Sequence, residues 1–111
     1  MQQYKITSHV LDASTGMPVS GMPVRLCRFE NGSWQLLAET VTNSDGRVLA
    51  WPGLSAPLSR GCYRLRFDID NHYGEASFYP YAEIVFRLQD ERHHHIPLLL
   101  SPFSYSTYRG S

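Results

Sequence analysis

The sequence has no excess of charge of either sign, because ten Lys and Arg residues balance ten Asp and Glu residues over 111 positions. A chain with balanced charge lacks the basic surface that would bind the phosphates of a nucleic acid. We therefore expect no nucleic-acid partner. Small molecules and further copies of the chain itself are the partners to expect.

Long apolar runs and cysteines are also scarce. No stretch approaches the roughly 20 apolar residues of a membrane span, and residues 1–6 lack the apolar core of a signal peptide. We therefore expect no membrane association and a cytoplasmic location. Cys27 and Cys62 do not make a disulfide framework, and in a reducing compartment we interpret both as small buried apolar residues.

What the chain has instead is turn-forming residues, spaced evenly between short runs of Val, Ile, Leu, Phe and Tyr. This spacing is typical of an all-β sandwich or barrel, and Asn31-Gly32 is its strongest hairpin signal. Strands are predicted over residues 5–12, 23–30, 33–41, 47–51, 62–70, 82–88, 93–101 and 104–109, and one short helix over 71–79. Because no repeat or linker interrupts the pattern, residues 1–111 are predicted to form one domain with one core.

Side chains alternate between the two faces of a strand, which separates core positions from candidate functional ones. In the first strand, Ile6 and Val10 share the face that suits a core, while His9 shares the other face with Thr7 and Leu11. In the seventh strand, Ile96, Leu98 and Leu100 suit the core, and His93 and His95 lie on the other face with Pro97 and Leu99. A face that mixes histidine with apolar residues is expected to meet a ligand or a neighbouring subunit.

The histidines allow three interpretations. His93 and His95 are spaced as metal ligands on a strand, yet no third ligand stands at a fixed spacing. They fit equally well as hydrogen-bonding residues at an interface, or as a proton-transferring pair, since imidazole titrates near neutral pH. His94, on the opposite face, and His72, in the irregular segment, are predicted to lie at the surface.

Two arginines are candidates for holding oxygen atoms of a ligand. Arg47 follows an Asp45-Gly46 turn, and Arg109 lies near the C-terminal end. A guanidinium binds carbonyl or anionic oxygens through two parallel hydrogen bonds and stabilises negative charge on them. Each arginine is explained as well by a solvated surface charge, and spacing alone does not decide between these interpretations.

Three segments together resemble one family. They are His9-Val10-Leu11-Asp12 with the Gly16-Met17-Pro18 turn, residues 42–47, and residues 95–102 through the closing Tyr108-Arg109-Gly110-Ser111. These segments resemble the 5-hydroxyisourate hydrolases, the transthyretin-related proteins. The resemblance spans nearly the whole chain. Transthyretin itself, the hormone carrier with the same fold, lacks the two histidines and the arginine at the matching positions.

The resemblance implies a transthyretin-like sandwich of two four-stranded sheets, assembled as a homotetramer with active sites at the subunit interface. It implies hydrolysis of 5-hydroxyisourate, a step of urate catabolism, to 2-oxo-4-hydroxy-4-carboxy-5-ureidoimidazoline, by water that a histidine activates, with no metal and no cofactor. The matching residues are His9, Arg47 and His95 for catalysis, and Tyr108, Arg109, Gly110 and Ser111 for substrate binding. The alternatives are a small-ligand carrier and a metal-binding structural protein. The segment 70–80 is shorter than in the family, so its helix is expected to shrink.

Overall fold

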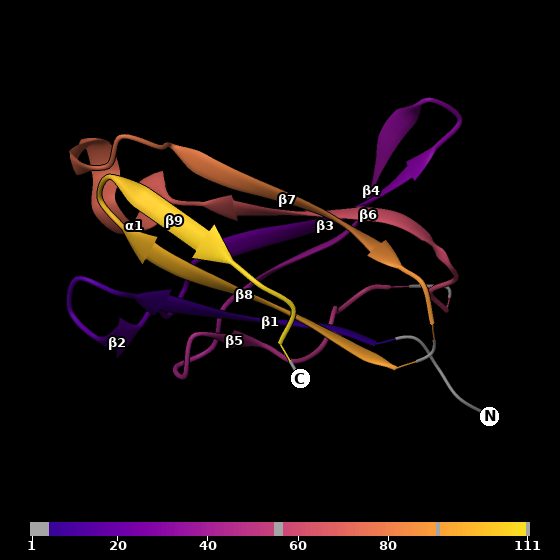
Figure 1. Ribbon diagram of the computed structural model, residues 1–111, viewed down its shortest axis with the longest axis horizontal. Helices are drawn as coiled ribbons and strands as arrows, with labels where there is room; N and C mark the ends of the chain where they lie inside the picture. The colour runs from indigo at the N-terminus through magenta and orange to yellow at the C-terminus, as the bar shows by residue number, and fades with distance from the viewer. Residues whose placement is uncertain (1–4, 55–56, 91, 111) are drawn as a thin grey trace.

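The computed structural model describes residues 5–54, 57–90 and 92–110, which form two β-sheets packed face to face (Figure 1). The elements are β1 (Lys5–Asp12), β2 (Met17–Pro18), β3 (Pro23–Glu30), β4 (Ser33–Val41), β5 (Arg47–Val48), β6 (Gly61–Asp68), α1 (Asp70–Tyr73), the 3-10 turn η1 (Gly74–Ala76), β7 (Tyr81–Leu88), β8 (His93–Ser101) and β9 (Ser104–Thr107). The predicted all-β, transthyretin-like sandwich is thereby confirmed. No helix in the described part of the chain is long and apolar enough to cross a membrane.

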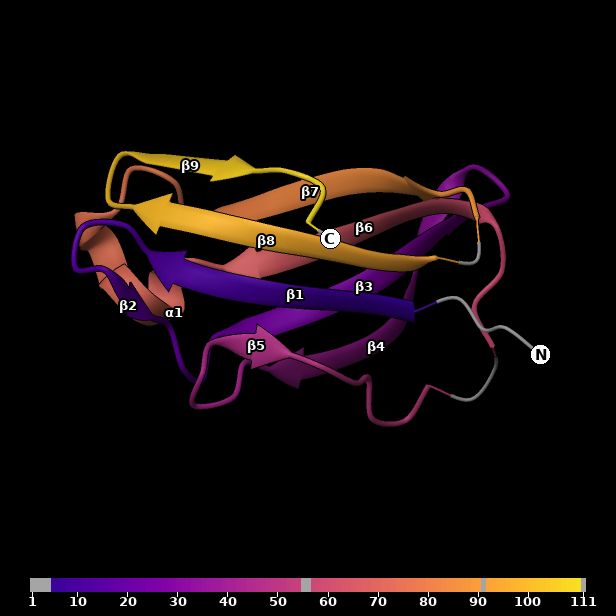
Figure 2. The ribbon, with the colours of Figure 1, turned by 60° about the horizontal axis from the view of Figure 1, so that its bottom comes forward.

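The first sheet has the order β2-β1-β8-β9, with β5 also pairing with β1, and the second has the order β4-β3-β6-β7 (Figure 2). β1 and β8 run parallel, with Thr7 opposite His95, whereas the other strand pairs are antiparallel. The second sheet has the four strands expected. The first also contains β2, which no prediction included, because two residues are too short to show an alternating pattern.

The core lies between the sheets and follows the predicted alternation. Ile6 and Val10 of β1 and Leu98 of β8 are buried against Leu65 and Phe67 of β6. Each such side chain contributes about 1.5–3 kcal/mol through the apolar surface it removes from water. Burial of these residues also determines which side chains point outward. The residues that alternate with them on β1 and β8 must point away from the core.

The predicted hairpin forms at Asn31-Gly32, between β3 and β4. Both residues have positive φ, 52° at Asn31 and 81° at Gly32, and Glu30 pairs with Ser33 across the turn. A two-residue turn of this kind matches the twist of its strands, and Asn and Gly are the residues that tolerate its backbone angles.

The segment after β6 remains helical, although it is short. The predicted strand over 62–70 ends at Asp68, and the helix predicted over 71–79 is reduced to α1 and η1. Four residues are too few for a helix to be stable alone, so tertiary contacts must hold it. One such contact joins His72 Nε2 to a carboxylate oxygen of Asp12, 2.8 Å away.

The prediction that His94 lies at the surface is wrong. His94 is 3% exposed, because strand alternation places it on the inward face of β8 with Ile96. Its Nδ1–H donates to the Arg92 carbonyl oxygen at 2.7 Å. His72 is exposed, as predicted. Cys27 is buried, Cys62 is half-buried, and both are free thiols.

Candidate active site

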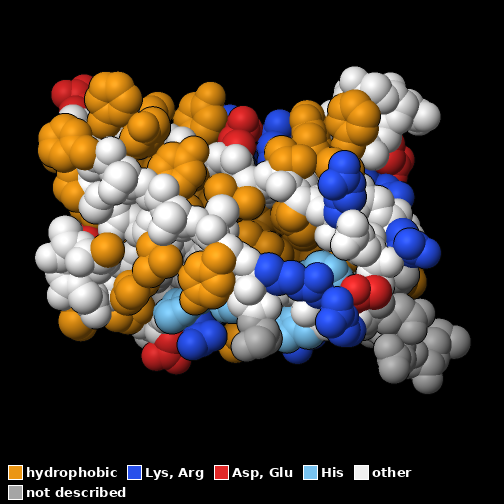
Figure 3. Space-filling view, in the orientation of Figure 1, with side chains coloured by type: hydrophobic (Ala, Val, Ile, Leu, Met, Phe, Trp, Pro, Cys, Tyr) orange, Lys and Arg blue, Asp and Glu red, His pale blue; other side chains and the backbone are white. Residues whose placement is uncertain are grey.

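The outward face of the first sheet brings together His9, Arg47 and His95. His9 lies on β1 directly opposite Arg47 on β5, and Thr7, two residues before His9, lies opposite His95 on β8. All three side chains therefore project from neighbouring strands on one side of the sheet. In Figure 3, histidine side chains lie beside Lys and Arg side chains along the part of the surface that β1 and β8 form.

The turn before Arg47 is built to approach β1 closely. Asn43 Oδ1 accepts hydrogen bonds from the backbone N–H groups of Asp45 and Arg47, both at 2.9 Å. Gly46 has φ of 73°, and a Cβ atom there would lie 2.6 Å from the Val10 carbonyl oxygen. Only glycine fits this approach, which holds Arg47 next to His9.

The C-terminal segment crosses β8 at His95. The strand predicted over 104–109 ends at Thr107, and the chain then turns so that the Gly110 N–H donates to the His95 carbonyl oxygen at 2.8 Å. A Cβ atom at Gly110 would lie 2.6 Å from Cδ2 of the His95 ring, so the imidazole packs directly on this glycine. Tyr108 and Arg109 are exposed beside it, and Ser111 lies outside the described residues.

Burial and neighbouring positive charge favour the neutral form of both imidazoles. Partial burial lowers the pKa of His9 below 6.5, and the Arg47 guanidinium lowers it further, against a smaller opposing contribution from Asp45. Burial is also the largest cause that lowers the pKa of His95, followed by the charges of His93, Arg47 and His9. A neutral imidazole offers one nitrogen lone pair, which is what a general base requires.

One contact at the site was not predicted. The hydroxyl of Thr7 lies 2.7 Å from His95 Nδ1 and 2.5 Å from His93 Nε2. Thr7 shares the histidine-bearing face in the sequence pattern, and only the parallel register of β1 and β8 reveals that it lies between the two rings. His93 and His95, considered above as a metal pair, have no third His, Cys, Asp or Glu grouped with them among the described residues.

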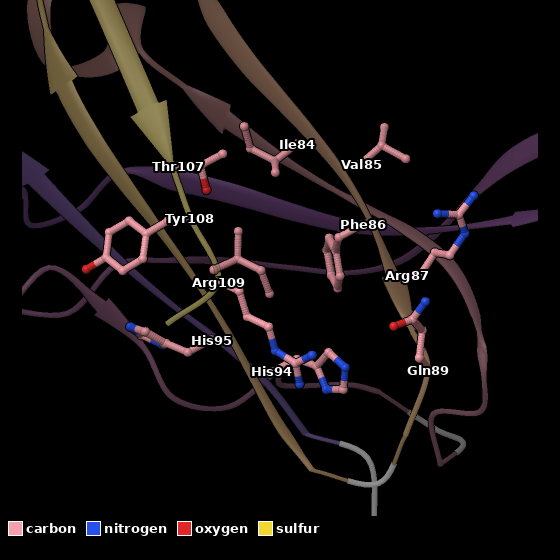
Figure 4. A pocket seen from close by; sticks show the side chains of 11 residues that line it. Ile84, Val85, Phe86, Arg87, Gln89, His94, His95, Thr107, Tyr108 and Arg109 are labelled. Carbon is pink, nitrogen blue, oxygen red and sulfur yellow. The ribbon is translucent and has the colours of Figure 1, made fainter. Parts of the chain in front are cut away.

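A pocket of about 390 Å³ lies next to this site, between β7, β8 and the C-terminal segment (Figure 4). His94, His95, Tyr108 and Arg109 line it together with Phe86, but His9 and Arg47 do not. Figure 4 shows His94 and His95 extending in different directions from β8. The pocket therefore includes His95, whereas His9 and Arg47 lie outside it on the outward face of the sheet.

Known proteins show the same sequence pattern and fold. A family model described as the HIUase/Transthyretin family matches residues 6–110. The 5-hydroxyisourate hydrolase of Mus musculus is 46% identical over 96% of this chain and 94% of its own length. The 5-hydroxyisourate hydrolase of Halalkalibacterium halodurans is 44% identical over 96% of this chain and 98% of its own.

Solved structures agree with these sequence matches. The 5-hydroxyisourate hydrolase of Klebsiella pneumoniae superposes with a TM-score of 0.84 at 37% identity, over 98% of this chain and all of that one (100%). Transthyretin from Sparus aurata superposes with a TM-score of 0.82 at 29% identity, over 95% of each chain.

The two packed sheets, with histidines and an arginine gathered on the outward face of one of them, define a transthyretin-like sandwich with a candidate site on that face. The sequence matches make the assignment more specific. The chain belongs to the HIUase/Transthyretin family.

Proposed function

We propose that this protein hydrolyses 5-hydroxyisourate to 2-oxo-4-hydroxy-4-carboxy-5-ureidoimidazoline, a step of urate degradation. The observation that carries the proposal is the meeting of two imidazoles of lowered pKa, His9 and His95, with the Arg47 guanidinium on one sheet face. The names of the Mus musculus and Halalkalibacterium halodurans relatives support the same substrate.

The reaction is the hydrolysis of a cyclic amide, and His9, His95 and Arg47 supply its proton transfers and charge stabilisation. One imidazole takes a proton from a water molecule as the water oxygen attacks the ring carbonyl carbon. The Arg47 guanidinium stabilises the oxyanion that forms, a contribution of about 3–4 kcal/mol for a well-placed donor. The ring C–N bond then breaks, and an imidazolium returns a proton to the leaving nitrogen.

The closing residues Tyr108, Arg109, Gly110 and Ser111 are proposed to bind the substrate. Gly110 holds this segment against His95 through its backbone hydrogen bond, which places Tyr108 and Arg109 beside the imidazole. The Arg109 guanidinium lies 3.9 Å from Asp90 at the surface, too far for a strong ion pair, and it remains available to substrate oxygens.

We propose that a homotetramer completes the site at a subunit interface. On a single chain the outward sheet face leaves Arg47 exposed and His9 only half-buried, beside the half-buried Leu11 and Leu99. A second copy over this face would cover the apolar side chains and exclude water from the reacting groups. The similarity to transthyretin supports this arrangement, because the fold supplies the same exposed sheet face.

The second candidate, a small-ligand carrier, has the fold in its favour. A transthyretin of sea bream bound to thyroxine superposes with a TM-score of 0.81 at 31% identity. The side chains of this chain argue against it. Burying two histidines and an arginine in a closed apolar channel costs free energy. Such groups are therefore expected there only if they take part in a reaction.

The test follows the ultraviolet absorbance of freshly generated 5-hydroxyisourate against its spontaneous decay. Wild-type protein is expected to accelerate the decay, and His9→Ala and His95→Ala to lower kcat by about 10²–10⁴-fold, the usual contribution of general acid–base catalysis. Wild-type rates in both variants would contradict the site. Tight thyroxine binding without hydrolysis would favour the carrier.

A further inference from the structure

Thr7 occupies an unusual place for a small polar residue. It points to the outward face of the first sheet, yet it is 2% exposed, because the rings of His93 and His95 cover it. Its Oγ1 lies 2.5 Å from His93 Nε2 and 2.7 Å from His95 Nδ1. The two rings, with centroids 6.0 Å apart, are thus joined through one hydroxyl.

A hydroxyl has one proton to donate, so it cannot donate to both rings at once. In one arrangement His95 Nδ1–H donates to Thr7, and Thr7 donates to His93 Nε2. This leaves a lone pair on His95 Nε2. In the other arrangement His93 Nε2–H donates to Thr7, and Thr7 donates to His95 Nδ1, which leaves a proton on His95 Nε2. The direction of the chain therefore fixes the tautomer of His95.

We propose that Thr7 and His93 are positioning residues that set the tautomer of His95 and carry its proton to and from His93. The inference rests on the proposed function for its catalytic consequence, but the tautomer of His95 is a property of the free protein. The first arrangement makes His95 a base at Nε2, and the second makes it an acid at the same atom. One side chain can then serve both halves of a hydrolysis.

The proton balance closes over one turnover. His95 Nε2 accepts the proton of the attacking water, the Nδ1 proton passes to Thr7, and the hydroxyl proton of Thr7 passes to His93 Nε2. The positive charge has then moved from His95 to His93. As the ring C–N bond breaks, reverse transfer from His93 through Thr7 returns a proton to His95 Nδ1, and the imidazolium so formed gives its Nε2 proton to the leaving nitrogen, which restores the first arrangement.

The surroundings of His93 fit a proton acceptor in contact with water. His93 is exposed, and partial desolvation together with the charges of Lys5 and His94 lowers its pKa, which favours the neutral form that can accept a proton. His9 on β1 and Arg47 on β5 act on His95 from the other side, and Tyr108 and Arg109 lie beside it in the C-terminal segment. A protonated His93 would force the second arrangement and remove the basic lone pair of His95.

The first test measures the tautomer directly, by ¹⁵N NMR of the histidine ring nitrogens in the ligand-free protein at pH 8. Wild-type His95 is expected to carry its proton on Nδ1. Thr7→Val removes the shared hydroxyl, and the proton of His95 is expected to shift toward Nε2, the site favoured in free imidazole side chains. An unchanged His95 tautomer in Thr7→Val would overturn the proposal without touching the proposed function.

The second test measures kinetics and is interpreted only if the wild type hydrolyses 5-hydroxyisourate. Thr7→Val is expected to lower kcat by about tenfold or more, within the range of general acid–base contributions, with little change in KM because Thr7 lies beneath the rings. Thr7→Ser restores the hydroxyl and is expected to recover most of the loss. Equal losses of kcat in Thr7→Ser and Thr7→Val would overturn the relay.

His93→Gln separates hydrogen bonding from proton transfer. The amide oxygen accepts the bond from Thr7 but takes no proton at neutral pH, so we expect a lower kcat and the loss of one ionisation from the acid limb of its pH profile. A wild-type kcat and pH profile would overturn the role of His93. Ser8→Ala is the matched control, because Ser8 donates to the Ile96 carbonyl oxygen at 2.7 Å on the inward face of the same strand pair. It is expected to lower stability and leave kcat unchanged.

Discussion

Asp12 and His72, sixty positions apart, meet where the end of β1 faces α1, with His72 Nε2 2.8 Å from an Asp12 carboxylate oxygen. The Asp12 carboxylate is almost wholly buried and also accepts hydrogen bonds from the Ser14 backbone N–H and hydroxyl. Burial alone would raise the pKa of Asp12, but the hydrogen bonds from Ser14 and His72 outweigh it and hold the pKa well below its usual range.

This arrangement predicts a loss of stability in acid. A carboxyl group whose pKa is lower in the folded chain stabilises the fold above its unfolded pKa of about 3.9, and the contribution is lost as the pH falls through the folded value. Asp12→Asn is expected to lower the free energy of unfolding at pH 7 by about 1–3 kcal/mol, since it removes the charged acceptor. Urea unfolding at several pH values measures both effects. If the free energy of unfolding of Asp12→Asn fell below pH 4 as much as that of the wild type, Asp12 would not be the source of the acid sensitivity.

The tight packing of Gly110 on His95 predicts that a single methyl group disturbs the site. In Gly110→Ala the new Cβ would lie 2.6 Å from the His95 ring, so the segment or the ring must move. We expect kcat/KM to fall about tenfold or more, since displacements of about 1 Å reduce rates strongly. Gly32→Ala is the control, because its backbone is strained but its Cβ meets open space far from the site. It should lose about 1 kcal/mol of stability and no activity.

The sequence predicts those features of the site that depend on neighbouring residues in the chain. It does not predict those that depend on contacts between distant segments. Alternation within single strands places His9 and His95 on outward faces, and Asn31-Gly32 marks a hairpin, because both signals are local. The parallel pairing of β1 with β8 joins segments more than 80 residues apart, and no local period encodes it. The bridging position of Thr7 therefore emerged only from the structure.

His94 shows a second kind of limit. The alternation correctly separated it from His93 and His95, but a histidine was assigned to the solvent because the residue type suggests exposure. Its neighbours on the same face are Ile96 and Leu98, which are buried, and position on the strand outweighs residue type. The strand alternation alone would have predicted that His94 is buried. The prediction failed because it assumed that a histidine side chain lies in solvent.

The charge of Arg47 predicts how the histidines titrate. Arg47 lowers the pKa of His9 and of His95, so removing its charge in Arg47→Gln should raise both values. The measurement is an NMR titration of the histidine ring protons, which needs no substrate. Arg25→Gln, on β3 in the other sheet, is the control and should leave both titrations unchanged. If each of the two histidines had the same pKa in Arg47→Gln as in the wild type, the guanidinium would not act on them.

The same pKa shifts predict the acid limit of activity. Because burial and neighbouring positive charge lower the pKa values of both imidazoles from 6.5, the basic forms persist below that pH. The acid limb of kcat/KM, which reports the free enzyme, is expected to have its midpoint below pH 6.5. A midpoint above pH 7 would mean that a group other than these imidazoles limits the rate.

A carboxylate on the outward face of β8 should separate the subunits of the proposed tetramer. Leu99 is half-buried on this face, two residues beyond the Pro97 that pairs with His9, so a second copy that covers the site would also cover Leu99. In Leu99→Glu, burial of an unpaired charge would oppose association by several kcal/mol. Light scattering coupled to gel filtration is expected to show a mass of four chains for the wild type and less for the variant, with activity lost in parallel. Leu36→Glu, exposed on β4 of the other sheet, should keep both the wild-type mass and the activity. A dissociated variant with full activity would mean that one chain holds a complete site.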